Sequence, residues 1–245
     1  MNWDKFSEFF HESWHPKIRP FIESEDCDKI YEFLKKESKR GRKIAPLSFD
    51  VFRAFKETSL DNLKVVLMGM CPYHTIRKDM KFPSGVIVAD GLLMGCSHTG
   101  TIQPSLDQFY NAVEKDVYNG LNLKYVKTPD VSYLAHQGVL MLNAALTTEI
   151  NKAGSHIALW QPFTEYLFTE VLSITQVPIV FLGKDASKYK RFVAPFTWTF
   201  TLSHPASAAY SNTEWSTEGT FTKVNKILKD NNNYEIQWLY EEAPF

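Results

Sequence analysis

Apolar residues along the chain follow two different spacings, which indicate two kinds of element. Four short unbroken apolar runs are typical of strands buried on both faces, namely Val65–Met68, Gly138–Leu142, Pro178–Leu182 and the threonine-rich Phe196–Leu202. Four other stretches carry apolar residues at helical spacing, namely Asp50–Phe55, Ser105–Val117, Pro162–Ile174 and Thr220–Leu228. Because strands alternate with helices, we predict an α/β fold with a central, mostly parallel four-stranded sheet flanked by helices.

The composition is that of a globular protein with one domain. The 245 residues are 44% apolar, and no linker rich in Pro, Gly or Ser divides them, so residues 1–245 are predicted to be a single domain. No run of about 18 apolar residues or signal peptide occurs, so we expect no membrane segment. Three cysteines, Cys27, Cys71 and Cys96, make neither a disulfide framework nor a zinc site, which favours the reducing cytoplasm.

The charge balance leaves nucleic acid open as a partner. A net charge of −1 argues against a histone-like protein, but a local basic face can still bind phosphates. The strongest charge run, Lys35–Lys43, is either a solvated helix end or a patch that contacts phosphates. The chain has no glycine-rich phosphate loop, nucleotide fingerprint or His/Glu metal motif, so no cofactor and no metal are expected.

Polar residues follow the predicted strands at the points where each strand ends. In a parallel sheet the ligand crevice lies beyond the carboxyl ends of the strands. The segments that would meet there share polar or small residues, and they are Gly69–His74, Asn143, Gly183–Asp185 and Ser203–Ser207. One crevice would therefore gather a tyrosine, an asparagine and one or two histidines.

These strand-end segments resemble the motifs of one enzyme family, the family 1 uracil-DNA glycosylases. Gly69–His74 reads GMCPYH and resembles the water-activating motif GQDPYH, while Gln137–Thr147 resembles QGVLLLNxxLT. Ser203–Ala208 resembles the HPSPL loop, and Pro104–Leu106 matches the end of the proline-rich loop. Four motifs in family order, spread between Trp3 and Trp238, imply the fold of this family and a monomeric DNA glycosylase.

The resemblance implies a role for each matching residue. Such enzymes flip one nucleotide into a pocket, where Asn143 would read the pyrimidine edge and Tyr73 would block a C5 substituent. His204 would stabilise the negative charge of the departing base. The resemblance also implies a set of residues that bind DNA. They lie in the loops that press on the DNA backbone, and they are Pro104, Ser105, Gly183, Lys184, Ser207 and Ala208.

The departures from the family pattern fall along the reaction path. Cys71 replaces the aspartate that orients water, and its thiol, with a reference pKa of about 8.5, would be mostly neutral near pH 7. Met70 replaces a glutamine, and Met94 replaces the phenylalanine that stacks on the base. Ala208 stands where the family has the leucine that fills the space left by the flipped base.

An insertion of roughly ten residues, at about 75–88, would lie beside the base pocket. It contains Asp79, and Asp90 follows it at the pocket. Both are interpreted first as solvated loop carboxylates, although either would be able to replace the missing aspartate. Cys71 itself is either a catalytic residue or only a small buried one.

Three functions remain open at this stage. The favoured one is a monofunctional glycosylase that excises a modified pyrimidine, such as hydroxymethyl- or glucosylated cytosine, with defence against phages as one setting. The second is a slow or ordinary uracil-DNA glycosylase of base-excision repair. The third is a catalytically silent DNA-binding relative, for which the loss of the aspartate and the leucine would be the reason.

Overall fold

A four-stranded parallel sheet forms the centre of the protein, as the sequence predicts. The computed structural model describes residues 3–119, 121 and 124–241. The strand order is β6 (Val139–Asn143), β2 (Val65–Gly69), β8 (Ile179–Leu182) and β9 (Thr199–Leu202), and every neighbouring pair is parallel. All residues of β2, β6 and β8 are buried, which explains why these strands are unbroken apolar runs.

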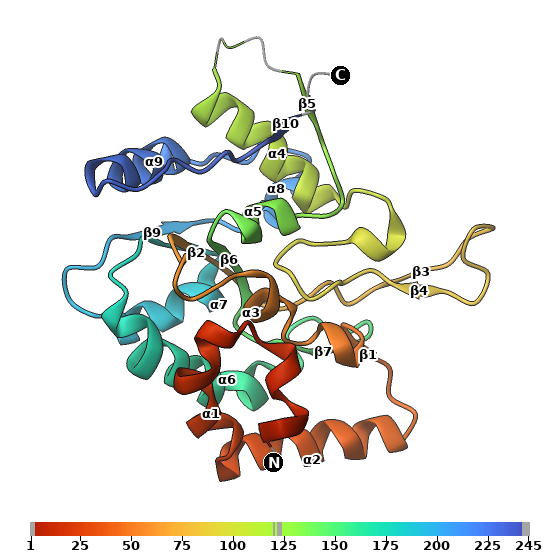
Figure 1. Cartoon of the computed structure of the whole chain (residues 1–245). Coiled ribbons are helices and arrows are strands. Elements are labelled where there is room, and N and C mark those ends of the chain that lie inside the picture. The colour runs from red at the N-terminus through yellow and green to blue at the C-terminus, as the bar shows by residue number, and fades with distance from the viewer. Residues whose placement is uncertain (1–2, 120, 122–123, 242–245) are drawn as a thin grey trace.

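Helices cover both faces of the sheet (Figure 1). The layer drawn below the sheet contains α1 (His15–Ile22), α2 (Glu25–Lys39) and α6 (Ile157–Tyr166). The layer above it contains α4 (Pro104–Val117), α5 (Ser132–His136), α8 (Pro205–Ser211) and α9 (Thr220–Asp230). Two short helices, α3 (Arg53–Glu57) and α7 (Lys184–Ser187), lie against the sheet between these layers.

Aromatic side chains fill the two spaces between sheet and helices. Below the sheet, Phe55 and Phe163 meet edge to face with their ring centroids 5.6 Å apart. Above it, Phe221 and Trp238 meet with their centroids 4.7 Å apart. Such contacts stabilise the layers beyond simple burial of apolar area, so the strand ends are held on a rigid support.

Two predicted helices differ from the structure. Asp50–Phe55 is not one helix, because a 3-10 turn at Ser48–Asp50 precedes α3 and the buried Asp50 carboxylate accepts a hydrogen bond from His98 Nε2 at 2.7 Å. The helix predicted at Pro162–Ile174 begins earlier, at Ile157, and changes to π and 3-10 geometry after Tyr166. The predicted start is wrong because proline is best tolerated in the first turn of a helix, whereas Pro162 lies inside α6.

The insertion forms a β-hairpin. Strands β3 (Ile76–Arg77) and β4 (Val86–Ile87) pair antiparallel, with Ile76 opposite Ile87. The hairpin extends away from the body of the protein (Figure 1). Two further small sheets join β1 (Ile44–Ala45) to β7 (Thr148–Glu149) and β5 (Tyr125–Val126) to β10 (Tyr240–Glu241).

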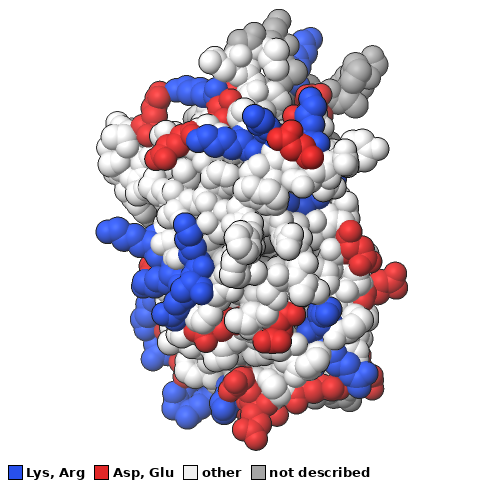
Figure 2. Space-filling view, turned by 90° about the vertical axis from the view of Figure 1, so that its left-hand side faces the viewer, with Lys and Arg blue, Asp and Glu red and all other residues white. Residues whose placement is uncertain are grey.

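The surface carries both signs of charge. Figure 2 shows the left-hand face of Figure 1, with uncharged residues at its centre and Lys, Arg, Asp and Glu around them. The charge run at Lys35–Lys43 covers the last turns of α2, which ends at Lys39 before the left-handed Gly41 (φ +78°). Among the described residues, none of the helices is long and apolar enough to cross a membrane.

Candidate active site

The four strands end at one edge of the sheet, and main-chain hydrogen bonds fix the loops that follow. Beyond β2, the carbonyls of Gly69 and Met70 accept from the amides of Ala144 at 2.9 Å and Ala145 at 3.0 Å. Beyond β8, the Gly183 amide donates to the Leu202 carbonyl at 2.8 Å. The ladder therefore continues past the strands and holds their ends in register.

The side chains of Asn143 and His204 converge above Gly69. A Cβ atom placed on Gly69 would lie 3.4 Å from Asn143 Oδ1 and 3.6 Å from His204 Nε2. It would also lie 2.4 Å from Leu93 Cδ1, so a larger residue at this position would displace the Leu93 side chain. An amide and an imidazole thus face one small space at the end of β2.

Asn143 is buried without a partner for its side chain. It is 2% exposed, and neither its Oδ1 nor its Nδ2 makes a hydrogen bond within the described part of the chain. A buried polar atom without a partner costs about 1–3 kcal/mol of stability, so this arrangement needs an explanation. A ligand that presents a donor and an acceptor side by side would satisfy both atoms.

His204 is held as a neutral imidazole. Its Nδ1 accepts a hydrogen bond from the Ala206 amide at 3.1 Å at the start of α8, which assigns the proton to Nε2. Burial lowers the pKa of His204 to about 4, so the ring is uncharged at neutral pH. Gly183, with φ +90°, packs against it, since a Cβ there would lie 3.2 Å from His204 Cβ. The Nε2–H is therefore a preorganised donor.

Tyr73 and Ser105 form a second, linked part of the site. The Tyr73 hydroxyl is 2.6 Å from Ser105 Oγ, and burial raises the pKa of the phenol while the Ser105 hydrogen bond opposes that rise. Ser105 is only 4% exposed. Its hydroxyl therefore fixes the Tyr73 ring, which differs from its predicted place in a phosphate-clamping loop.

Cys71 and Met70 face the loop around Gly154. Cys71 Sγ accepts a hydrogen bond from the Gly154 amide at 3.2 Å. Burial, with a smaller contribution from the charge of Asp185, raises the pKa of the thiol, so it is neutral and does not act as a base. Met70 Sδ lies 3.6 Å from the Cβ position of Gly154. Neither the Gly154 contact nor the approach of Leu93 was predicted, because each joins segments far apart in sequence.

The two predicted replacement carboxylates are both engaged elsewhere. Asp90 is fully buried, pairs with Arg53 Nη1 at 3.0 Å, and accepts from the amide and the hydroxyl of Ser97 at 2.9 and 2.7 Å. The prediction of a solvated loop carboxylate is wrong for Asp90, because it fastens the loop that carries Met94. Asp79 lies in the hairpin and binds Arg77.

The remaining predicted residues divide between surface and interior. Pro104, Lys184 and Ser207 are exposed at the ends of the sheet-edge loops. Ala208 is 7% exposed on α8, which packs against α4, and its contact with DNA stays a prediction. Met94 is 5% exposed and has a left-handed backbone (φ +59°). Within the described ranges, no group of three or more His, Cys, Asp or Glu side chains is placed to bind a metal.

Comparison with known proteins assigns the family. The model of the uracil DNA glycosylase superfamily matches residues 55–229. The uracil-DNA glycosylase of Pseudomonas aeruginosa strain UCBPP-PA14 is 31% identical over 229 residues, 92% of this chain and 93% of the relative. That of Streptococcus uberis is 31% identical over 234 residues, 94% and 99% of the two chains.

Solved structures agree on the fold. The crystal structure of mimivirus uracil-DNA glycosylase superposes with a TM-score of 0.78 at 23% identity, covering 97% of this chain and 89% of the other. The UNG structure from Nitratifractor salsuginis gives 0.60 at 18% identity, covering 99% of each. The chain therefore belongs to the uracil-DNA glycosylase superfamily, whose members are DNA glycosylases that hydrolyse N-glycosidic bonds.

Proposed function

We propose that the protein flips one pyrimidine nucleotide out of DNA and hydrolyses its N-glycosidic bond, leaving an abasic site. The observation that carries this proposal is the convergence of the unpartnered Asn143 amide and the neutral His204 imidazole on one space. A pyrimidine edge offers the adjacent donor and acceptor that Asn143 lacks.

The chemistry follows from where charge develops. As the bond from C1′ to the base breaks, the electron pair goes to the base and positive charge builds on the sugar. The His204 Nε2–H donates to the base oxygen that gains negative charge, which is the role of an oxyanion donor. Water adds to C1′ and loses a proton to solvent, and the DNA phosphates stabilise the sugar cation.

For the target base we propose a modified pyrimidine, such as hydroxymethyl- or glucosylated cytosine. Met94 supports this, because a flexible thioether adapts to irregular shapes better than a stacking ring does. A neutral thiol at Cys71 also departs from the pattern of ordinary uracil enzymes. The hairpin supports it further, since it begins directly after Tyr73 and His74. Defence against phages with modified DNA would be one setting for such an activity.

Uracil is the second candidate, and one contact favours it. The Tyr73 ring is fixed by Ser105 at 2.6 Å, and a fixed ring beside C5 leaves little room for a bulky group. The curated relatives are also named uracil-DNA glycosylases. We propose that the protein acts as a monomer on DNA, which places it in the cytoplasm, at the nucleoid of a prokaryotic cell.

An excision assay on oligonucleotides that each carry one target base tests these proposals. The bases are uracil, thymine, hydroxymethyluracil, hydroxymethylcytosine and glucosylated hydroxymethylcytosine, and alkaline cleavage reveals abasic sites. Cutting at a modified base in preference to uracil supports the first candidate, and cutting only at uracil supports the second. Binding without any cutting would overturn both and favour the silent relative.

A further inference from the structure

The hairpin of β3 and β4 is rigidly attached beside the candidate site. Its first paired residues follow His74, and the Val88 amide closes its base by donating to the Thr75 carbonyl at 3.1 Å. Arg77 Nη1 donates to the Thr99 carbonyl at 2.8 Å, in the segment that leads into Pro104. In Figure 1 the hairpin runs beside that segment. The hairpin is therefore an extension of the edge that carries Asn143 and His204.

The tip of the hairpin is an ordered turn. Asp79 Oδ1 accepts from the amides of Lys81 at 2.9 Å and Phe82 at 3.0 Å, and the Gly85 amide donates to the Phe82 carbonyl at 2.9 Å. Because these bonds hold the backbone, the side chain of Met80 is presented from a preformed position. A side chain held in this way loses less entropy when it binds a partner.

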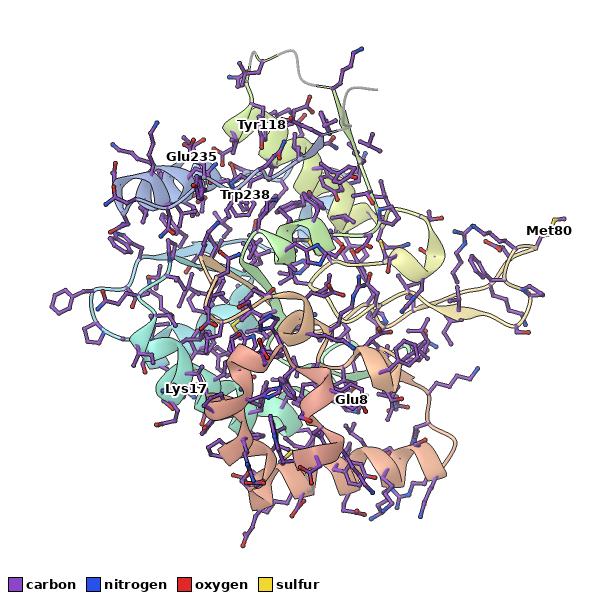
Figure 3. The ribbon with its side chains drawn as sticks, viewed as in Figure 1. Glu8, Lys17, Met80, Tyr118, Glu235 and Trp238 are labelled. Carbon is purple, nitrogen blue, oxygen red and sulfur yellow. The ribbon has the colours of Figure 1, made fainter. Side chains whose placement is uncertain are left out.

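The chemistry of the tip is an apolar side chain among cations. Met80 is 100% exposed, and Figure 3 shows it at the far end of the hairpin, directed away from the body. Lys78 and Lys81 are exposed on either side of it. Lys81 Nζ and the Arg77 guanidinium lie 5.3 and 5.2 Å from the centre of the Phe82 ring. Within three positions of one fully exposed apolar side chain, the hairpin therefore carries three cations and one carboxylate, that of Asp79.

This combination fits double-stranded DNA better than a protein partner. Proteins that kink DNA insert apolar side chains, methionine among them, between base steps, while nearby cations neutralise phosphates. The distance also suits a duplex. Met80 lies five positions after Thr75, so at about 3.3 Å per residue the tip reaches at most roughly 16 Å beyond the pocket edge, the length of about five base pairs.

We propose that the hairpin is a second DNA-contacting element, in which Met80 inserts between bases of the duplex within about five base pairs of the flipped nucleotide. Lys78 and Lys81 contact the phosphates on either side. The inference rests on the proposed function, because it takes DNA to be bound at the Asn143 and His204 site. It assigns the tip of the insertion to contact with the duplex, while the base of the hairpin lies next to the pocket that would recognise the target base.

The test uses the full chain and a set of DNA duplexes that carry a tetrahydrofuran abasic-site analogue, with 2-aminopurine placed in turn at each of about five base steps beside it. Unstacking by Met80 should raise the 2-aminopurine fluorescence on binding, and Met80→Ala should abolish that rise and weaken duplex binding about tenfold. Met80→Leu should restore both. Phe196→Ala is the matched control, because Phe196 is 97% exposed but precedes β9, at the opposite edge of the sheet.

Phosphate contacts are tested through salt. Replacing both Lys78 and Lys81 with Gln should reduce the slope of log affinity against log salt by about 2. An unchanged fluorescence rise in Met80→Ala, or an unchanged slope in the double variant, would overturn the hairpin proposal. Because the analogue cannot be excised, these readouts do not depend on glycosylase activity. Failure of the excision assay with the fluorescence rise intact would reject the proposed reaction and leave the hairpin contact standing.

Discussion

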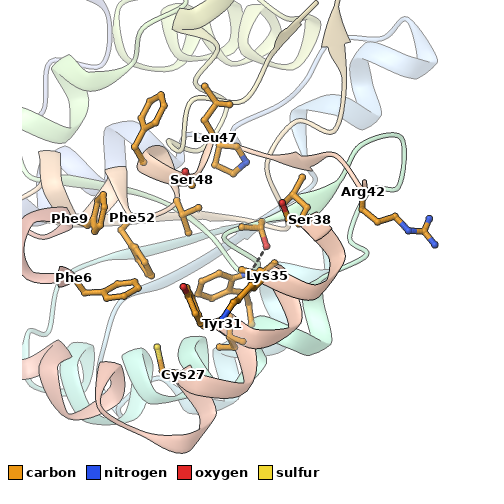
Figure 4. Close-up of a pocket in the computed structure, with 18 residues that line it drawn as sticks. Phe6, Phe9, Cys27, Tyr31, Lys35, Ser38, Arg42, Leu47, Ser48 and Phe52 are labelled. Carbon is orange, nitrogen blue, oxygen red and sulfur yellow. Dashed lines mark hydrogen bonds between the residues drawn. The ribbon is translucent and has the colours of Figure 1, made fainter. Parts of the chain in front are cut away.

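Two hollows in the protein differ in the polar groups that they present to a ligand. One lies between α2 and the Ser48–Phe52 segment, has a volume of about 550 Å³, and is lined mainly by apolar side chains such as Phe6, Phe52 and Trp160 (Figure 4). The other is the small space above Gly69, where Asn143 leaves two buried polar atoms without partners.

The comparison shows that volume alone does not identify a functional site. The hollow beside α2 is mainly apolar, and its two basic residues are paired, Lys35 with Glu32 and Arg42 with Glu37 and Glu149. Nothing in its lining specifies a ligand. The space above Gly69 specifies one through the direction of each donor and acceptor. A bound ligand would supply the hydrogen bonds that Asn143 Oδ1 and Nδ2 lack.

Removing the donor from the small site should give the largest effect. His204→Ala should slow single-turnover excision about 100- to 1,000-fold, because one oxyanion donor is typically worth that much. Duplex binding should change far less. His136→Ala is the control, since that side chain is 59% exposed and precedes β6, so it lies toward the amino end of the strand, away from Asn143. Full excision by His204→Ala would remove the basis for assigning the chemistry to this space.

The burial of His204 also makes stability depend on pH. Its pKa falls to about 4 in the folded protein, against 6.5 for a free histidine, so the unfolded chain binds the proton first. Unfolding free energy should therefore decrease as pH falls from about 6.5 toward 4, by roughly 2 kcal/mol between pH 7 and pH 5.

Urea denaturation of the wild type and of His204→Gln at the two pH values measures this difference. The variant should lose less stability at pH 5 than the wild type does. His136→Gln should keep the wild-type difference. Equal pH dependence in His204→Gln and the wild type would mean that the imidazole is solvated and does not lie in a closed site.

Placing a negative charge at Cys71, where the family has an aspartate, should change the rate of excision. If the pocket admits uracil, Cys71→Asp should raise its excision about tenfold, because a carboxylate there would face the positive charge on the sugar. Cys71→Asn, which has the same shape without charge, is the control and should give no gain. No gain in either variant would show that recognition of uracil fails elsewhere in the pocket, as expected for a modified target base.

The sequence predicts the framework because burial leaves a clear pattern. Strands β2, β6 and β8 are covered on both faces, so each is an unbroken apolar run bounded by turn residues. The strand ends then bring Asn143 and His204 together by topology alone. That both reach within 3.6 Å of one point above Gly69 required the structure.

Contacts between distant segments account for what the sequence does not predict. Asp90 looks like a loop carboxylate, but its environment is set by Arg53 and Ser97, which no local pattern relates to it. Tyr73 and Ser105 are 32 residues apart, so nothing in their neighbourhoods indicates that one fixes the other. The insertion is apparent in the sequence, whereas its hairpin depends on four residues pairing across a turn.

The smallest expected effect concerns the hollow beside α2. Cys27 lines it and is 5% exposed, so Cys27→Leu would place extra apolar atoms in empty space and should raise the unfolding free energy by about 1 kcal/mol. Excision should stay within twofold of the wild type. Cys96→Leu is the matched control, because Cys96 is fully buried and does not line this hollow. The larger side chain would overpack the core there and should lower the unfolding free energy of the protein by about 1–3 kcal/mol. An equal loss of stability in both variants would contradict this prediction. It would mean that the hollow is filled in solution and holds a ligand.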